Sequence, residues 1–556
     1  MPGRTTTPLA DPATIADVPS AFRDPSLRDW QRRALEAAVP WRSGPFLIAA
    51  APGAGKTRPA LVLARELLRR REIDRVAIVC PTAPLTQQWA AAAAAVGLSL
   101  QPDSATLRTT GDFQGVAVTY ARATAAAATY ARECTPRTLV VADEVHHLGD
   151  ELAWGAGFSK AFAAAGRKLL LSGTPFRSDD APIPGISYDG DGFARPDVAY
   201  SYAEAILDGA CRRMIFVPFD GTLVWQSGDR TIESSFEEDL SIRERGRRYR
   251  TAISTELPEG LPRILRQADQ QLTRVRAEGH PEAGGLVVAA DSAHARVVAG
   301  ALAEISGESP TVVLHQDSGA HGRLRRFSGS RERWIVAVNM VSEGVDIPRL
   351  RVGVYATTAK TAMIFRQIVG RFVRTGSGSK GNSWLFLPAE PVLRAHAAKI
   401  EEEIHRVLRR GGADEEGLWD EGEERLQTEP GPDDDEPDFV PVAADVVPQM
   451  NLFGEPGDEA VQPAPAPAAV AAAEEEMLPD EPPPIPAFQR RKNLRADRHR
   501  LISELARKRR WTHREANVWI NGKSGVKRVE DATIAQLQRS CDLLVDELVR
   551  SSRGSR

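Results

Sequence analysis

The stretch FLIAAAPGAGKT, from Phe46 to Thr57, decides how the first half of this chain folds. Its first five residues have the length and composition of a buried strand, and the sequence ALVLARELLRR that follows the turn is typical of a helix. Between strand and helix, glycines let backbone N–H groups close around phosphates, Lys56 can reach the β- and γ-phosphate oxygens, and the Thr57 hydroxyl can hold Mg²⁺. The sequence therefore predicts a phosphate-binding loop formed by Pro52, Gly53, Ala54, Gly55, Lys56 and Thr57.

A second apolar run, TLVVA, ends in DEVHH at Asp143 to His147. An acidic residue at the end of a strand can help to hold Mg²⁺, and the next carboxylate can orient and deprotonate an attacking water. We therefore expect Asp143 to be a metal ligand and Glu144 a catalytic base for nucleotide hydrolysis. Taken alone, two acidic residues at a strand end are also typical of a solvated loop. We assign the adjacent histidines to coupling rather than to zinc.

Short apolar runs alternate with helix-length segments along most of the chain. The first series is Phe46–Ala50, Val76–Cys80, Val116–Thr119, Leu139–Ala142 and Lys168–Leu171, and the second is Gly285–Ala290, Thr311–Leu314, Trp334–Val338, Val352–Tyr355 and Ser383–Leu387. This rhythm is typical of parallel sheets with helices on both faces. The predicted fold class is therefore α/β, with two parallel-sheet lobes in tandem.

These two series set the expected domain boundaries. We expect a disordered N-terminus over 1–20, a first lobe over 21–205 and a second lobe over 283–410. The residues between the lobes, 206–282, include the basic sequence RERGRRYR at Arg243 to Arg250. We predict that they form a connector with an added helical portion.

The net charge of −4 conceals a segregation of charge along the chain. Residues 411–486 contain 22 acidic residues and one basic residue, together with QPAPAPAAV and EPPPIP. This composition cannot bury enough apolar surface to fold alone, so it predicts a disordered acidic linker. The rest of the chain is correspondingly basic. A basic surface suits a protein that neutralises nucleic-acid phosphates, although a solvated surface without a partner has the same composition.

Residues 487–556 are strongly basic, with QRRKNLRADRHR, ARKRR and KSGVKR. Apolar residues near the C-terminal end recur three and four positions apart, at Ile534, Leu537, Cys541, Leu544 and Leu548. This spacing predicts a small helical module with one apolar stripe. Its cations, with Trp511 and Trp519, could bind phosphates and stack on bases, and a plain solvated helical face is the alternative.

Composition argues against several classes of protein. No apolar run approaches the roughly 20 residues that span a bilayer, and the opening sequence MPGRTTTPLADPATIADVPS lacks the apolar core of a secretory signal. We expect a cytoplasmic protein with no membrane partner. The four cysteines are far apart and include no CxxC pair, which predicts reduced thiols and neither disulfides nor a zinc site.

From about Leu27 to Leu387, a series of motifs resembles that of superfamily 2 helicases, in the same order. Besides the phosphate loop and DEVHH, the motifs are LRDWQ (27–31), CPTAPLTQQW (80–89), VTYARA (118–123), SGTPFR (172–177), VVAADSAHA (287–295), VNMVSEGVDIPRL (338–350) and RQIVGRFVR (366–374). The wording of SEGVDIP, QIVGRFVR and DEVHH resembles the XPB/UvsW and type I or III restriction-motor group. The resemblance implies two RecA-like lobes that use ATP and Mg²⁺. Ala50 stands where such phosphate loops usually begin with glycine.

The resemblance implies roles for individual residues. Gln31 would hydrogen-bond the adenine edge, and Asp346 would face the ribose, with Gly344 in the same motif. The coupling between nucleotide and nucleic acid would involve Ser172, Thr174 and His147. Nucleic-acid contacts are implied at Pro81, Thr82, Thr119, Tyr120, Asp291, Ser292 and Asn339. Asn339 or Met340 stands where many relatives carry a threonine, so this last contact departs from the family pattern.

The last motif supplies two arginines to the same chemistry. A guanidinium group can stabilise the charge on a transferring γ-phosphoryl group, and we expect Arg371 and Arg374 to do so, with Gln367 at the family spacing. Salt bridges to acidic surface groups are the alternative role for these arginines. Because they belong to the second lobe, hydrolysis would depend on closure of the cleft, and closure would change the grip on the strand.

We therefore expect an ATP-dependent DNA helicase or duplex translocase, because the restriction-motor group acts mostly on DNA. Repair, recombination, phage-related replication and restriction or defence are the candidate pathways. An ATPase that remodels RNA is the first alternative, because backbone contacts scarcely distinguish the two sugars. An inactive nucleic-acid-binding scaffold is the second, and the intact motor residues argue against it. Any strand cleavage would belong to a partner nuclease, and a methyltransferase is a second candidate partner.

Overall fold

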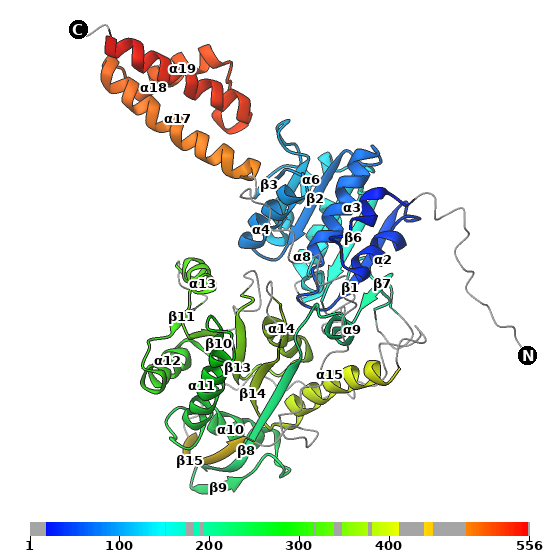
Figure 1. Ribbon diagram of the computed structural model, residues 1–556, viewed down its shortest axis with the longest axis vertical. Helices are drawn as coiled ribbons and strands as arrows, with labels where there is room; N and C mark the ends of the chain where they lie inside the picture. Colours follow the sequence, from blue (N-terminus) through cyan, green and yellow to red (C-terminus); the bar gives the residue numbers. More distant parts are fainter. Residues whose placement is uncertain are drawn as a thin grey trace, which may run out of the picture. The chain divides into compact units, whose positions relative to one another are not determined.

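The computed structural model describes residues 18–150, 152–173, 183–188, 194–314, 319–338, 347–375, 381–410, 439–448 and 485–553. The chain divides into two compact units. The first comprises Met1–Ile48, Lys56–Val198 and Met477–Arg556, and the second comprises Ala49–Gly55 and Ala199–Glu476. The elements are labelled in Figure 1.

A seven-stranded sheet runs through the described residues of the first half of the chain, in the order β3-β4-β2-β5-β6-β1-β7. Its strands are β1 (Gly44–Ala50), β2 (Arg75–Cys80), β3 (Leu100–Pro102), β4 (Gly115–Thr119), β5 (Thr138–Asp143), β6 (Arg167–Ser172) and β7 (Val198–Tyr200). β2 pairs in parallel with β4 and β5, and β5 pairs in parallel with β6. The five strands predicted here from apolar runs are confirmed, and the short strands β3 and β7 were not predicted.

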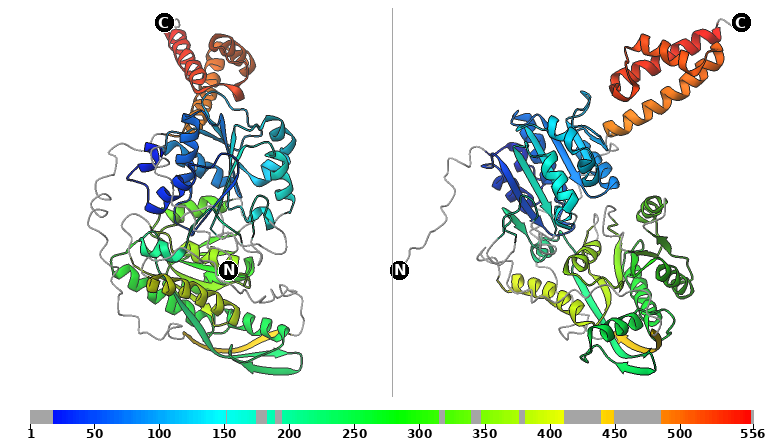
Figure 2. Two further views of the ribbon diagram at one scale, coloured as in Figure 1. Left: turned by 90° about the vertical axis from the view of Figure 1, so that its right-hand side faces the viewer. Right: turned by 180° about the vertical axis from the view of Figure 1, so that it is seen from behind.

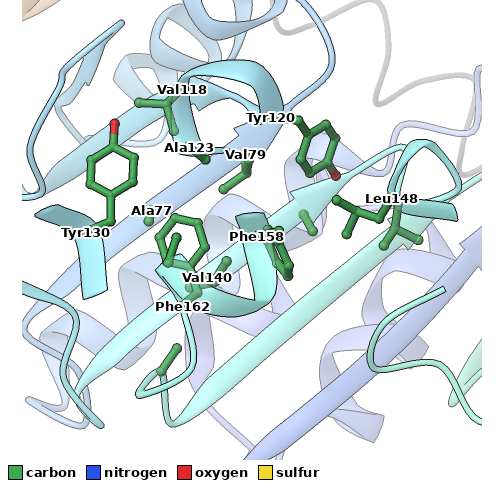
Figure 3. Close-up of a cluster of buried hydrophobic side chains, with 14 of the residues drawn as sticks. Ala77, Val79, Val118, Tyr120, Ala123, Tyr130, Val140, Leu148, Phe158 and Phe162 are labelled. Atoms are coloured by element: carbon green, nitrogen blue, oxygen red, sulfur yellow. The ribbon is translucent and has the colours of Figure 1, made fainter. Parts of the chain in front are cut away.

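Helices connect these strands and lie on both sides of the sheet (Figure 2). They are α2 (Asp29–Ala37), α3 (Thr57–Arg69), α4 (Ala83–Ala95), α5 (Tyr120–Ala125), α6 (Ala127–Glu133), α7 (His147–Asp150) and α8 (Leu152–Ala161). On one side, aromatic side chains such as Tyr120, Phe158 and Phe162 pack against Val118 and Val140 in one buried cluster (Figure 3). Burial of each large side chain contributes about 1.5–3 kcal/mol, so this cluster holds α5 and α8 on the sheet.

A second, eight-stranded sheet has the order β11-β12-β10-β13-β14-β8-β15, with β9 paired to β8. Its strands are β8 (Met214–Ser227), β9 (Arg230–Ser234), β10 (Gly284–Ala289), β11 (Thr311–Val313), β12 (Trp334–Val338), β13 (Leu350–Ala356), β14 (Ser383–Pro388) and β15 (Phe439–Pro448). The helices of this unit are α9 (Tyr202–Leu207), α10 (Ile242–Ala252), α11 (Leu261–Ala277), α12 (Ser292–Ser306), α13 (Ala320–Ser328), α14 (Ala362–Phe372) and α15 (Pro391–Arg410). The five predicted strands of the second series are confirmed.

The predicted connector over 206–282 is largely part of the second sheet and its covering helices. β8 pairs in parallel with β14 along Met214 to Phe219, and α11 packs on β13. The tyrosine of RERGRRYR, Tyr249, is fully buried and donates a hydrogen bond to the carbonyl of Thr357. The helical portion predicted for these residues is present as α10 and α11, and the sequence did not indicate that β8 joins the second sheet, because its partner strand β14 lies far along the chain.

The acidic segment 411–486, predicted as a linker, contributes strand β15, which the prediction missed. The strand has the sequence FVPVAADVVP, whose β-branched residues favour a strand, and it pairs antiparallel with β8. Asp445 Oδ1 lies 2.6 Å from Nη1 of Arg263, and the Arg250 guanidinium lies 4.7 Å from the centroid of the Phe439 ring. The remainder of this segment, 411–438 and 449–484, lies outside the described residues, as does 1–17 of the predicted N-terminus.

Substitution of the buried face of β15 tests whether the strand stabilises the second unit. Val446 is 0% exposed and Val440, on the same strand, is 53% exposed. Val446→Ala should lower the free energy of unfolding by about 1–3 kcal/mol, because apolar contacts are lost and a cavity remains. Val440→Ala is the matched control and should cost less than about 0.5 kcal/mol in a denaturant titration. Equal effects of the two substitutions would contradict the docking of β15.

The basic C-terminal residues are helical, as predicted, and their described part contains three α-helices. They are α17 (Ala487–Arg509), α18 (His513–Ser524) and α19 (Ile534–Arg553). The predicted apolar stripe is buried from Leu537 to Leu548. Within the first unit, the backbone N–H of Ile534 donates to Asp112 Oδ2 at 3.0 Å, and the Arg491 guanidinium lies 5.6 Å from the Phe113 ring centroid. Among the described residues, no helix has the length and apolarity needed to cross a membrane.

Candidate nucleotide-binding site

The phosphate loop connects β1 directly to α3, which confirms the predicted order of strand, loop and helix. Gly53 and Gly55 have φ angles of +83° and +88°, a left-handed conformation that glycine adopts without steric cost. Lys56 occupies the position that precedes α3 and is almost buried, and Thr57 is the first residue of the helix. The loop therefore presents Lys56 and Thr57 at a helix N-terminus, where backbone N–H groups favour an anion.

Asp143, at the end of β5, is held by side chains from two neighbouring segments, one bound to its carboxylate and one to its main-chain carbonyl. The indole N–H of Trp89 donates to Asp143 Oδ2 at 2.8 Å. The hydroxyl of Tyr120 donates to the main-chain carbonyl of Asp143 at 2.7 Å, and Figure 3 shows this hydroxyl at the edge of the buried cluster. The backbone N–H of Glu144 donates to Asp143 Oδ1 at 3.1 Å. Asp143, which is 9% exposed, is thus fixed in position before any ligand is present.

Glu144 turns back toward the phosphate loop. Its φ angle of +49° lies in the left-handed region, which is uncommon for a residue with a side chain and recurs at functional sites. Glu144 Oε1 lies 3.9 Å from Lys56 Nζ. The backbone N–H of Gly173, from the SGTPFR motif, also hydrogen-bonds the Glu144 carboxylate. The fold thus brings together three motifs that are far apart in the sequence.

The two adjacent carboxyl groups have opposite tendencies to ionise. Burial, with the nearby charge of Glu144, raises the pKa of the Asp143 carboxyl to about 6. Burial also raises the pKa of Glu144, but the charges of Lys56, His146 and His147 outweigh this effect and lower that pKa to about 2. Glu144 is therefore ionised at neutral pH, and Asp143 is the carboxylate whose charge most needs a cation.

His146 contacts Ser172 of the SGTPFR motif. Its Nδ1 atom is 3.4 Å from Ser172 Oγ and 3.6 Å from Glu144 Oε2, and the ring is buried. The ring centroid of the predicted coupling residue His147 lies 4.4 Å from that of His146 and 6.4 Å from that of Trp154, with the planes tilted. His146 thus lies next to two of the predicted coupling residues, Ser172 and His147, whose coupling role stays a prediction. Thr174 lies outside the described residues.

Sequence reasoning did not anticipate that Trp89 donates a hydrogen bond to Asp143 or that His146 lies beside Glu144. Trp89 ends the motif CPTAPLTQQW, which was assigned as a whole to nucleic-acid contact. A buried indole usually needs an acceptor for its N–H, so the tryptophan was the available signal. The acceptor could not be identified, because Asp143 is on another strand.

The predicted arginines of the second unit lie on α14 and directly after it. Within that unit, which includes the loop segment Ala49–Gly55, a Cβ atom on Gly53 would lie 3.0 Å from Arg374 Cγ. A Cβ atom on Gly370 would lie 2.6 Å from Pro52 Cβ. Arg371 is buried, and Gln367 is on the same helix. Both glycines thus face close neighbours, which accounts for the small residues at these positions. Gly344 and Asp346 lie outside the described residues.

Gln31 is buried and its amide oxygen accepts a hydrogen bond from the backbone N–H of Arg28 at 3.0 Å. This contact caps α2 and fixes the orientation of the Gln31 amide. The adenine contact stays a prediction, and the fixed amide would present its NH₂ group to a base.

The predicted nucleic-acid contacts fall into two groups. Tyr120 is fully buried and its hydroxyl donates to the Asp143 carbonyl, so its ring lies in the core, and a nucleic-acid contact at this position stays a prediction. Pro81 and Thr82 directly precede α4, Thr119 caps α5, and Asp291 caps α12, of which Ser292 is the first residue. These positions stay predictions, and they share a place at the N-terminal ends of helices, where phosphates bind favourably. Asn339 lies outside the described residues.

The oxygen donors at this site fit a hard divalent cation. Mg²⁺ prefers carboxylate and hydroxyl oxygens and keeps several waters, which matches Asp143 with Thr57. Among the described side chains, no group of three His, Cys, Asp or Glu residues is arranged to hold a metal ion.

Comparison with known proteins identifies the class. A family model described as "Type III restriction enzyme, res subunit" matches residues 24–177. Two uncharacterized proteins of Mycobacterium tuberculosis strains are each 44% identical over 399 residues, 70% of this chain. The match spans 66% of their length. An uncharacterized protein of Mycobacterium leprae is 39% identical over 436 residues, 77% of this chain and 72% of that protein.

Three solved structures match the chain at low sequence identity. A fragment described as an HsdR subunit of a type I restriction enzyme from Vibrio vulnificus has a TM-score of 0.46 at 17% identity, over 68% of this chain and 67% of that one. The type ISP restriction-modification enzyme LlaBIII bound to DNA has a TM-score of 0.43 at 16% identity, over 65% and 27%. Dbp5 of Saccharomyces cerevisiae bound to RNA and ADP BeF3 has a TM-score of 0.44 at 13% identity, over 71% and 91%.

The fold has two α/β lobes built on mostly parallel sheets, and the first lobe carries the candidate phosphate loop. The chain belongs to the same family as the Mycobacterium leprae protein, and residues 24–177 match the model of the type III restriction enzyme res subunit.

The burial of Asp143 yields a prediction about stability that does not depend on activity. In the unfolded chain this carboxyl ionises near pH 4, and in the folded chain at about pH 6, so ionisation opposes folding above pH 6 and has no effect below pH 4. Asp143→Asn should therefore raise the free energy of unfolding at pH 8 by roughly 1–3 kcal/mol and leave it nearly unchanged at pH 4. Chemical denaturation at the two pH values measures the difference.

Trp89→Phe is the opposing control for this experiment. It removes the N–H that stabilises the ionised carboxylate, so the pKa of Asp143 should rise further, and the variant should lose more stability at pH 8 than at pH 4. If each variant changes the free energy of unfolding equally at both pH values, the raised pKa of the Asp143 carboxyl is contradicted.

Proposed function

We propose that this chain is an ATP-dependent motor that hydrolyses ATP with Mg²⁺ and moves along or unwinds DNA. The observation that carries the proposal is the approach of Lys56 Nζ to Glu144 Oε1, at 3.9 Å, beside the buried Asp143 carboxylate. This arrangement supplies a cation for phosphates, a base for water and a metal ligand in one place. A structural ion pair alone would not need the glycine loop or the left-handed Glu144.

The chemistry divides among the residues of the chain. Lys56 and the loop N–H groups bind the β- and γ-phosphates, and Asp143 with Thr57 holds the cation. Glu144, ionised at neutral pH, orients a water molecule and accepts its proton as the water oxygen attacks the γ-phosphorus and ADP leaves. Mg²⁺, when bound, neutralises charge that develops on the phosphates. His146 and Ser172 connect this carboxylate to the coupling motif.

DNA is the proposed substrate because the family model that matches residues 24–177 describes a restriction-enzyme subunit. RNA is the alternative. Restriction or defence is accordingly the leading pathway, ahead of repair, recombination and phage-related replication, and a nuclease or a methyltransferase is the proposed partner. We also propose a cytoplasmic location.

Removal of the phosphate-binding lysine or of the base should stop hydrolysis. Lys56→Ala and Glu144→Gln should each lower nucleic-acid-stimulated ATP hydrolysis by at least about 100-fold, with an unchanged circular-dichroism spectrum. Glu36→Gln, at an exposed position on α2, is the control and should keep the full rate. An unchanged rate of ATP hydrolysis in either variant would contradict the proposed catalytic roles of Lys56 and Glu144. Stimulation compared across single-stranded DNA, duplex DNA, forked DNA and RNA decides between DNA and RNA.

Arg374→Ala should separate hydrolysis from binding. If its guanidinium stabilises the transferring phosphoryl group, hydrolysis should fall by about 1,000-fold or more while a fluorescent ATP analogue binds as before. Arg230→Ala, an exposed arginine of the same unit, is the control. Loss of nucleotide binding together with hydrolysis would instead indicate a structural arginine.

A further inference from the structure

Two tryptophans of the C-terminal helices form one surface. Trp511 directly follows α17 and Trp519 lies on α18, with ring centroids 6.0 Å apart and planes inclined by 55°. Each ring packs one side against a core that includes Ile502, Leu505 and Ile520. Both tryptophans are only half-buried, so part of each ring remains at the surface.

The rings line an open depression of about 410 Å³ together with Arg514, Glu515 and Val518. Val518 is 67% exposed, although the apolar core of the same helices lies close by. The side chain of Val518 and part of each indole ring are therefore left at the surface of these helices. Glu515 binds the backbone N–H and the hydroxyl of Thr512, which caps α18 and keeps this carboxylate at the helix end.

Cations surround the tryptophans. The Arg509 guanidinium lies 5.6 Å from the Trp511 ring centroid, and the Lys523 ammonium lies 5.8 Å from that of Trp519. Arg514 is exposed beside the depression. Over 487–556 the sequence has 18 basic and eight acidic residues. The surface thus combines flat apolar rings with positive charge, which complements an anionic ligand that has flat apolar groups.

We propose that the surface formed by Trp511, Arg514, Val518, Trp519 and Lys523 binds single-stranded nucleic acid. Unpaired bases stack on the two indoles, and the cations contact the backbone phosphates. Bases that are paired within a duplex cannot reach these rings, so the site selects single strands. The proposal rests on the proposed function, to which it adds a second contact outside the motor lobes.

Binding to the full-length protein without nucleotide tests the site. The probes are a fluorescein-labelled oligothymidylate and a labelled duplex of equal length, followed by anisotropy at several salt concentrations. The double variant Trp511→Ala/Trp519→Ala should bind the single strand about tenfold or more weakly with an unchanged salt dependence, and the duplex as before. Trp511→Phe/Trp519→Phe keeps both rings aromatic and should retain most of the affinity.

A charge variant tests the same surface without removing the indoles, in case their loss disturbs the packing of the helices. Arg514→Glu/Lys523→Glu leaves the tryptophans in place and should weaken single-strand binding while making it less dependent on salt. Unchanged single-strand affinity in the alanine variant, or equal loss for strand and duplex, overturns the proposal. Full single-strand affinity combined with binding of an acidic peptide to this surface would overturn it in favour of a protein partner.

Failure of the proposed single-strand site can be distinguished from failure of the proposed ATP-dependent motor function. Binding is measured without ATP, so Lys56→Ala should retain single-strand affinity even though it cannot hydrolyse ATP. The alanine double variant should keep the hydrolysis rate at saturating DNA. Loss of hydrolysis in that variant at saturation would show that the tryptophans support the motor rather than a separate site.

Discussion

The buried carboxylate of Asp143 is the constraint on which the first unit depends. Burial raises its pKa to about 6, so its charge must be stabilised by groups fixed in advance. Trp89 and the Glu144 backbone donate to its oxygens, and Tyr120 holds its main chain. These donors can converge because β2, β4 and β5 are neighbours in one parallel sheet, so the segments that follow them start from the same edge.

This geometry places the positions predicted to contact nucleic acid next to the residues that hold Asp143. α4 and α5 follow the positions predicted to contact nucleic acid, at Pro81, Thr82 and Thr119. The same helices supply Trp89 and Tyr120 to Asp143. A shift of either helix against the sheet would therefore alter the carboxylate directly, without passing through intermediate residues. On the other side, His146 and Gly173 connect Glu144 to the coupling motif. The hydrogen bonds thus give a physical basis for the proposed coupling of hydrolysis to nucleic acid.

Strand β15 and the C-terminal helices make specific contacts that charge and composition do not reveal. β15, within an acidic segment, pairs with β8 because a run of apolar and β-branched residues interrupts the acidic runs and Asp445 forms an ion pair with Arg263. Within the first unit, the C-terminal helices contact Asp112 and Phe113. The Asp112 carboxylate accepts a hydrogen bond from the Ile534 backbone N–H, and the Arg491 guanidinium lies over the Phe113 ring. A net charge of one sign in each segment is therefore compatible with specific docking.

The sequence by itself determined the ten main strands, the phosphate loop and the apolar stripe of α19, because these depend on local hydrophobic period and on glycine conformation. It also identified Lys56, Asp143 and Glu144, whose chemistry depends on residue type next to a strand end. Only the tertiary structure decided that β8 and β15 join the second sheet, that Tyr120 is buried, and that Trp89 and His146 bind the acidic pair. Strand pairing and burial join residues distant in sequence, and no local pattern specifies which distant partner a side chain will meet.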